Sequence, residues 1–125
     1  KTIAEVSADA YDAIVLPGGQ MNPDTLRGTP EALTLIKRFF EQGKVVAAVC
    51  HAPWLLIDTG IAKGRRLTSY NTMKQDMINA GAMWEDSEVV TDKGVVTSRK
   101  PDDLPAFVAK IIEEVNEGRH ERRAA

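Results

Sequence analysis

The sequence predicts an α/β fold, a three-layer arrangement in which helices cover both faces of a mostly parallel β-sheet. Segments with the pattern of strands alternate with segments with the pattern of helices, which favours strand–helix–strand units. The two strongest strand segments, residues 11–16 and 45–49, are nearly continuous apolar runs, as expected for strands that are buried on both faces. Ligands of such sheets bind at the carboxyl ends of the strands, so we expect a site in the loops after residues 16 and 49.

The first half of the chain contains clear signals for where its elements begin and end. The strand at 11–16 is followed by Pro17-Gly18-Gly19, a sequence typical of a turn. The next helix is expected to begin after Thr29, a good N-cap, with Pro30 at the first helical position. Gly43 is suited to the left-handed conformation that ends many helices, so we expect this helix to end there.

The second half of the chain is expected to alternate in the same way and to close with a hairpin and a long helix. The expected elements are a helix from Pro53 to Gly60, a short strand at 66–68, a helix capped by Asn71 that ends at Gly81, a hairpin around Asp92-Lys93-Gly94, and a helix from about Pro101. The last helix carries an apolar stripe at helical spacing, formed by Leu104, Phe107, Val108, Ile111, Ile112 and Val115.

Length, charge and cysteine content limit the classes of function. The 125 residues are enough for one domain, which we place at 1–118, followed by a charged tail at 119–125. The 16 Lys and Arg nearly balance the 18 Asp and Glu, and no basic patch with interleaved aromatic residues argues for a nucleic-acid partner. A single cysteine forms no internal disulfide, so we expect a cytoplasmic protein. No apolar run is long enough for a membrane span or a signal peptide, so we expect no membrane partner.

The only cysteine, Cys50, lies where the strand at 45–49 passes into the helix that follows. The residues two before and two after it, Ala48 and Ala52, are both small, as the sharp strand-to-helix turn of a nucleophile elbow requires. A helix N-terminus beside the sulfur favours the thiolate. The alternative is a cysteine that serves as a small buried hydrophobe, and the adjacent His51 together with the paired alanines favours the nucleophile.

His51 is the candidate general base, and Asp24 is the candidate acid that orients it. Neighbours at a strand end tend to point apart, so His51 has the alternative of packing at the elbow without contacting the sulfur. Asp24 lies in the loop region after the first strand, and it has the alternative of serving only the first turn of a helix. From the residues alone, the two interpretations of Asp24 stay open.

The backbone amides of Gly18, Gly19 and His51 are candidates for binding an oxyanion. Gly18-Gly19 has the alternative of a plain tight turn, because it matches neither the dinucleotide nor the phosphate-loop pattern. Two histidines in the whole chain, His51 and His120, do not suggest a metal site, and we expect no cofactor. Trp54 and Trp84 are more typical of a core than of a pocket.

Six segments together resemble the ThiJ/PfpI family, within the class I glutamine-amidotransferase-like superfamily. The resemblance covers almost all of residues 9–115. The segments are residues 12–19 (DAIVLPGG), the Pro-Asp-x-Leu-Arg of 23–27, residues 48–53 (AVCHAP), 68–70 (TSY), 76–82 (DMINAGA) and 97–107 (TSRKPDDLPAF).

The resemblance implies a flavodoxin-like sandwich with Cys50 on the elbow and His51 beside it. It also implies a homodimer or higher homo-oligomer in which Asp24, at a position where other members carry Glu, approaches the histidine of a neighbouring subunit. Members of the family begin with a strand–helix unit bearing a glutamate that contacts the cysteine. We expect this unit to be absent from the 125 residues, which start after it in the family pattern. We therefore expect the strands at 14–16 and 45–49 to border a gap in the sheet.

The resemblance implies a cysteine-dependent hydrolase that acts on a peptide or a small molecule, either as an intracellular peptidase or as a deglycase or glyoxalase. A second hypothesis is a non-enzymatic stress, redox-sensing or chaperone-like protein in which Cys50 is oxidised. A third is a class I amidotransferase-like protein, which would need a late histidine followed two residues on by Glu. His120 is followed by Glu121 and Arg122, which does not fit that pattern.

Overall fold

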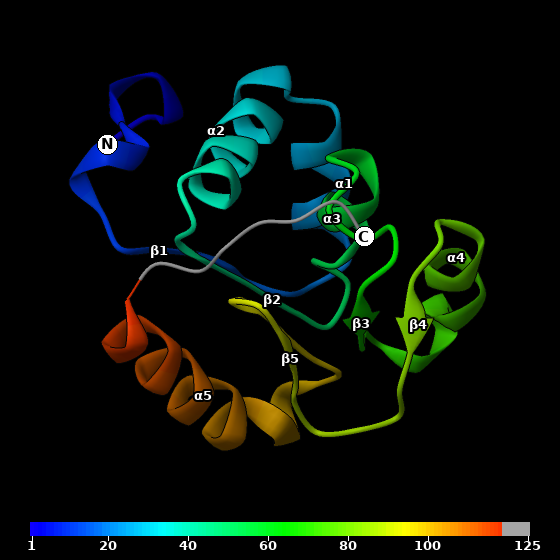
Figure 1. Cartoon of the computed structure of the whole chain (residues 1–125). Helices are drawn as coiled ribbons and strands as arrows, with labels where there is room; N and C mark the ends of the chain where they lie inside the picture. Colours follow the sequence, from blue (N-terminus) through cyan, green and yellow to red (C-terminus); the bar gives the residue numbers. More distant parts are fainter. Residues whose placement is uncertain (119–125) are drawn as a thin grey trace.

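Four strands form the main sheet, in the order β1-β2-β6-β5 (Figure 1). The structure is a computed structural model, and it describes residues 1–118. Strands β1 (Ala13–Leu16), β2 (Val45–Val49) and β6 (Val95–Ser98) run parallel, and β5 (Val90–Asp92) is antiparallel to β6. Since the three parallel strands end at the same edge, the loops after β1, β2 and β6 meet there.

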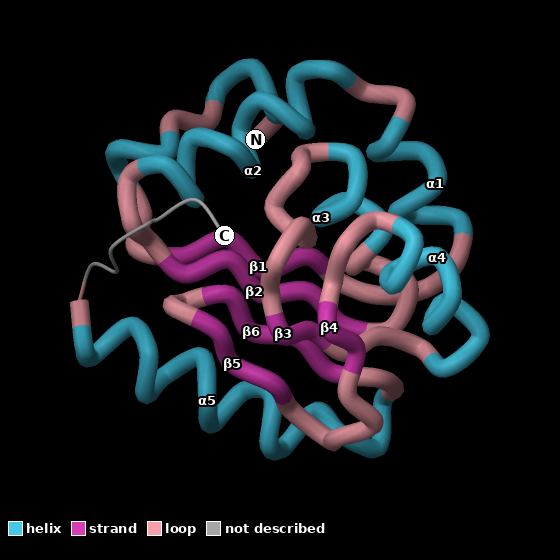
Figure 2. The backbone as a smooth tube through the Cα atoms, turned by 45° about the vertical axis from the view of Figure 1, so that its right-hand side comes forward, coloured by secondary structure: helices cyan, strands magenta, loops and turns pink. Residues whose placement is uncertain are grey.

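Helices cover both faces of this sheet, as the sequence predicts (Figure 2). Helix α5 (Leu104–Glu117) lies on one face. Helix α2 (Pro30–Glu41) lies on the other face, with α1 (Met21–Arg27) and α3 (Trp54–Asp58) beside it. Strand β2 is fully covered, with Val46 and Ala48 in the core under α2 and Val45, Ala47 and Val49 in the core under α5. Burial on both faces explains why β2 is an uninterrupted apolar run.

A second, two-stranded sheet adjoins β5, an outer strand of the main sheet. It pairs β3 (Arg66–Leu67) in parallel with β4 (Met83–Trp84), and α4 (Lys74–Asn79) connects them after a 3₁₀ turn at Asn71–Met73. The sequence predicts β3 but not β4, because two residues are too few to show a period. Further 3₁₀ turns lie at Ile3–Glu5, Ala8–Ala10 and Pro101–Asp103.

The structure confirms the predicted hairpin turn and the helix end at Gly43, but not the predicted caps at Thr29 and Asn71. The hairpin between β5 and β6 has a two-residue loop in which Lys93 and Gly94 have φ of 50° and 83°. Gly43, just past the end of α2, has φ 75°, as expected. Thr29 precedes α2 without a capping bond, since its hydroxyl donates to the Thr25 carbonyl instead. Asn71 is not a cap, because it lies inside a 3₁₀ turn.

Within residues 1–118, strand β1 pairs with a neighbouring strand, β2, on one side only. The expected gap beside residues 45–49 is wrong, because β2 pairs with β1 on one side and β6 on the other. Strands β1, β2 and β6 pair directly with one another, so an additional strand could join this sheet only outside β1 or outside β5. Beside the β1 edge Val15 is 50% exposed, and α5 leaves Leu104, Val108 and Ile112 exposed although Phe107 is buried. The apolar stripe of α5 is therefore only partly covered by β2 and β6.

None of the helices within residues 1–118 combines the length and the apolar character needed to cross a bilayer. The expected tail at 119–125, with His120, Glu121 and Arg122, lies outside the described residues.

We expect residues 1–125, expressed by themselves, to self-associate or aggregate, and an added N-terminal strand–helix fragment to reduce this. Unpaired backbone groups on β1 and the apolar residues beside it favour pairing with another chain. Size-exclusion chromatography with light scattering measures the association. Val15→Lys should reduce it, because a charge on an edge strand opposes pairing.

The matched control is Ile78→Lys, which places the same charge on an exposed apolar residue of α4. It should leave the association unchanged. A monodisperse, cooperatively melting monomer of residues 1–125 would contradict this prediction.

Candidate active site

Cys50 follows β2 directly and has a left-handed backbone conformation, with φ 65°. A residue other than glycine pays about 1–3 kcal/mol for such a conformation, so the surrounding structure must hold it. Two hydrogen bonds do this. The Cys50 amide donates to the Ser98 carbonyl at the end of β6 (3.0 Å), and the Cys50 carbonyl accepts from the Tyr70 amide (2.8 Å). The expected sharp elbow after β2 is therefore present.

The elbow is crowded, which explains the small residues around it. Ala48 and Ala52 are completely buried. Gly18, in the loop after β1, lies so close that a Cβ there would be 2.8 Å from the Cys50 Cβ and 3.2 Å from the Val49 carbonyl oxygen. Gly19 has φ 84°. The loops after β1 and β2 therefore meet, as the sequence predicts, and Gly18 is required by this close approach.

His51 contacts the cysteine sulfur. Its Nδ1 lies 3.1 Å from Cys50 Sγ, so the side chains of these neighbours do not point apart. The left-handed turn at Cys50 breaks the alternation of the strand, and this brings the two side chains to the same side. Partial burial disfavours the imidazolium and lowers the pKa of His51 below 6.5. A neutral ring can accept the thiol proton.

Two aromatic side chains enclose the His51 ring, and sequence reasoning assigned neither to the site. Tyr70 stacks on it, with ring centroids 4.8 Å apart and planes at 23°, and Trp54 lies at 5.1 Å with a tilt of 54°. Trp84 donates to the Ser69 hydroxyl, which donates to the Tyr70 carbonyl, so the loop carrying Tyr70 is tied to β4. Tyr70 lies in the loop three residues after the end of β3, and this loop after a strand was the available signal.

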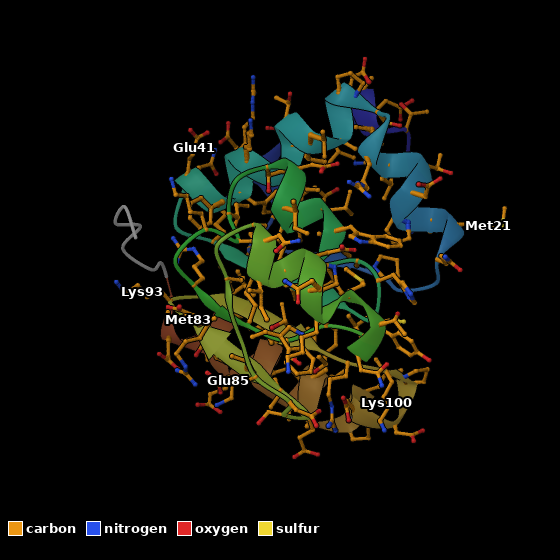
Figure 3. The ribbon with its side chains drawn as sticks, turned by 90° about the vertical axis from the view of Figure 1, so that its right-hand side faces the viewer. Met21, Glu41, Met83, Glu85, Lys93 and Lys100 are labelled. Carbon is orange, nitrogen blue, oxygen red and sulfur yellow. The ribbon has the colours of Figure 1, made fainter. Side chains whose placement is uncertain are left out.

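Asp24 lies on the exposed side of α1. None of the side-chain hydrogen bonds within residues 1–118 joins it to His51, so the orienting role of Asp24 stays a prediction. Its neighbour Arg27 forms a paired hydrogen bond with Asp58 of α3 and lies over the Trp54 ring at 5.5 Å, which fixes α1 against the site. Met21, at the start of α1, is 83% exposed and points away from the protein (Figure 3).

The helix after the elbow contributes less than the sequence suggests. It begins at Trp54, four residues after Cys50, and has only five residues, so its dipole at the sulfur is weak. The amides of Gly18, Gly19 and His51 donate to none of the oxygens of residues 1–118, which leaves them available to a ligand. Free donors beside a sulfur nucleophile are what an oxyanion site needs.

An apolar cavity of about 510 Å³ adjoins the site between the end of β1 and α5. It is lined by Val15, Pro17, Gly18, Gly19, Val49, Cys50, Pro101, Leu104, Phe107, Val108, Ile111 and Ile112. It therefore includes the exposed apolar residues beside the free edge of β1. Within residues 1–118, the one cluster of metal-type ligands is Glu113, Glu114 and Glu117 near the end of α5. Its ligand atoms lie within 4.8 Å of one another, and such acidic groups are common without an ion.

Together, the fold and the site define a flavodoxin-like α/β protein with a cysteine and a histidine in contact at a strand-to-helix elbow. Residues 1–114 match the DJ-1/PfpI family, and the chain belongs to that family.

Two curated proteins that are similar to this chain have names that describe an enzyme. A deglycase of Pyrococcus abyssi is 47% identical over 108 residues, which are 86% of this chain and 64% of that protein. A Bacillus subtilis protein described as a candidate cysteine protease is 47% identical over 107 residues, 86% of this chain and 63% of that one. The chain thus spans less than two thirds of the length of these two curated relatives.

A solved structure confirms the fold. A two-domain protein of Anabaena variabilis, with DJ-1/ThiJ/PfpI-like and ferritin-like domains, superposes with a TM-score of 0.88 at 39% identity. The match covers 91% of this chain and 32% of that chain. Flavodoxin-like architecture, predicted from the resemblance, is therefore shown.

Gly18→Ala should destabilise the elbow, because the new Cβ would overlap the Cys50 Cβ. We expect a loss of about 1–3 kcal/mol in the free energy of unfolding, typical of overpacking, together with slower alkylation of Cys50. Gly28→Ala is the matched control, since its Cβ would meet only the Thr25 carbonyl at 3.5 Å. Denaturant titration and iodoacetamide labelling measure the two effects. Equal behaviour of the two variants would contradict the close approach.

The pKa of His51 should lie below 6.5 in the folded protein, because burial disfavours its charged form. An NMR titration of the ring in Cys50→Ser, which removes the thiol, measures it. The unfolded state then binds this proton more readily than the folded state, so stability contributed by His51 should fall as the pH drops below 6.5. A midpoint at or above 6.5 would show that a nearby negative charge outweighs burial.

Proposed function

We propose that this chain carries the nucleophile and the base of a cysteine-dependent hydrolase, a deglycase or peptidase, with Cys50 as nucleophile and His51 as base. The observation that carries the proposal is the 3.1 Å contact between Cys50 Sγ and His51 Nδ1 on a left-handed elbow. The names of the two curated relatives, a deglycase and a candidate cysteine protease, support the same class of chemistry.

In the proposed reaction, His51 takes the Cys50 proton and the thiolate attacks a carbonyl carbon of the substrate. The negative charge passes to the carbonyl oxygen, where the amides of Gly18, Gly19 and His51 are available as donors. On a peptide, the C–N bond breaks, the imidazolium returns its proton to the leaving amine, and a thioester remains. Water then cleaves the thioester, restoring the thiol.

The aromatic enclosure of His51 supports its assignment as base. Tyr70 and Trp54 restrict the orientation of the ring and reduce its contact with water. A ring held in this way keeps Nδ1 toward the sulfur and stays neutral at lower pH than a free imidazole. We include Asp24 in the proposal as an acid supplied by the neighbouring subunit of a homo-oligomer. Its exposed position on α1 is compatible with contact to a second copy.

The test of the proposed function is turnover by the full-length protein. We expect hydrolysis of a small fluorogenic peptide or release of amine from a methylglyoxal-treated amino acid, with loss of activity in Cys50→Ser. The alternative, a redox sensor, predicts no turnover and a sulfinic acid at Cys50 under mild peroxide, seen as a mass increase. Turnover that survives Cys50→Ser would refute both.

The role of Asp24 can be tested by mixing inactive variants. Asp24→Asn should lower turnover far more than stability, because the residue is exposed. If Asp24 serves a partner subunit, mixing Asp24→Asn with Cys50→Ala should restore part of the activity in mixed oligomers. Asp9→Asn, an exposed carboxylate of a 3₁₀ turn, is the control. No rescue, with subunit exchange confirmed, would argue against a shared site.

A further inference from the structure

Asp103 is a buried carboxylate at the start of α5 that the proposed reaction does not use. Its side chain is 4% exposed. One oxygen accepts from the Arg99 backbone amide (3.0 Å) and from Arg99 Nε (2.9 Å), and the other accepts from Arg99 Nη2 (3.0 Å). Arg99 also donates to Asp86 (2.8 Å). These hydrogen bonds lower the pKa of Asp103, so the group stays ionised and Arg99 balances its charge.

Asp103 is linked to Cys50 by a single peptide group. The amide of Arg99 and the carbonyl of Ser98 belong to the same planar unit. Asp103 accepts from the amide end of this unit, and the Cys50 amide donates to its carbonyl end at 3.0 Å. A hydrogen bond at the amide polarises the carbonyl and makes it a better acceptor. The Ser98 hydroxyl donates to the Glu88 carbonyl (2.6 Å), which fixes the same unit from the other side.

We propose that Asp103 is a positioning residue for the nucleophile, holding the left-handed Cys50 backbone through the Ser98–Arg99 peptide group. The inference rests on the proposed function only in taking Cys50 as the nucleophile. Asp103 does not line the cavity at the site, so it acts through the peptide group and not on substrate. Without this anchor, Cys50 can relax toward an ordinary backbone conformation, which moves Sγ away from His51 Nδ1.

The effect should be local. Strand β2 stays paired with β1 along Ala13–Leu16 and with β6 along Val46–Val49, and these ladders do not involve Asp103. A purely structural role would lower stability and leave the reactivity of folded Cys50 unchanged. A positioning role changes the reactivity of the folded protein.

The test compares Asp103→Asn and Asp103→Ala with wild type in the full-length protein. The readouts are the rate of Cys50 alkylation by iodoacetamide in the folded protein and the hydrogen-exchange protection of the Cys50 amide. We expect alkylation to slow by about tenfold or more in Asp103→Ala, as for a small misplacement of a reacting group, with a smaller loss in Asp103→Asn. Protection of the Cys50 amide should fall in both.

The matched control is Glu85→Gln, which breaks an arginine–carboxylate pair of similar geometry with Arg66, away from the elbow. It should keep the wild-type alkylation rate. If Asp103→Ala does not fold, Asp103→Asn decides, because its amide keeps the size of the side chain.

Wild-type alkylation and wild-type Cys50 protection in a folded Asp103 variant would overturn the proposal. Neither readout uses a substrate, so failure of the proposed function is separate. If wild-type Cys50 reacts no faster than free cysteine, the nucleophile assignment fails. In that case the hydrogen-exchange measurement still tests whether Asp103 holds the Cys50 backbone. Unchanged protection of the Cys50 amide in an Asp103 variant overturns this role, and reduced protection supports it.

Discussion

The left-handed backbone of Cys50 is the constraint on which the rest of the site depends. It reverses the chain directly after β2 and brings the sulfur and the His51 ring to the same side of the elbow. The conformation is unfavourable for a residue with a Cβ, so it exists only where neighbouring groups hold it. Here the holding groups come from two other segments, the end of β6 through Ser98 and the loop after β3 through Tyr70. The conformation of Cys50 therefore depends on several segments that meet at this edge of the sheet.

Crowding and hydrogen bonding act together at this elbow. Gly18 allows the loop after β1 to pass within contact distance of Cys50, and the buried Ala48 and Ala52 leave room for the turn. Tyr70 and Trp54 cover the His51 ring, and its partial burial lowers its pKa. Backbone strain beside a thiol and an imidazole is compatible with the reactivity that we propose for Cys50.

The apolar side of α5 is the second feature that shapes the surroundings of Cys50. Phe107 is buried on the sheet, while Val108 and Ile112 stay exposed beside Val15 and the free edge of β1. The same surface continues into the cavity that reaches Cys50. Exposed apolar residues next to unpaired strand groups are unfavourable in water. Because these residues also line the cavity beside Cys50, a partner that covered the β1 edge would change the surroundings of that cysteine.

The sequence by itself determined the α/β architecture, the strands β1 and β2, and the place of Cys50 at a sharp turn directly after β2. The continuous apolar run of β2 identifies a strand buried on both faces, and two alanines around Cys50 identify a tight elbow, because both signals are local. The similar run of β1 does not, because Val15 is 50% exposed at the edge of the sheet. The hairpin at Lys93-Gly94 and the helix end at Gly43 were predictable for the same reason, since positive φ favours particular residues.

Only the tertiary structure decided which side chains meet. Tyr70 stacks on His51 from 19 residues further along the chain. Asp103 reaches Cys50 through the Ser98–Arg99 peptide group, although the two residues lie far apart in the chain. The contact between Cys50 and His51 also required the structure, because adjacency in sequence does not fix the direction of two side chains. Likewise, the order β1-β2-β6-β5 placed the free edge outside β1 and not beside β2. Such contacts depend on strand order and backbone conformation, which no local pattern of residues encodes.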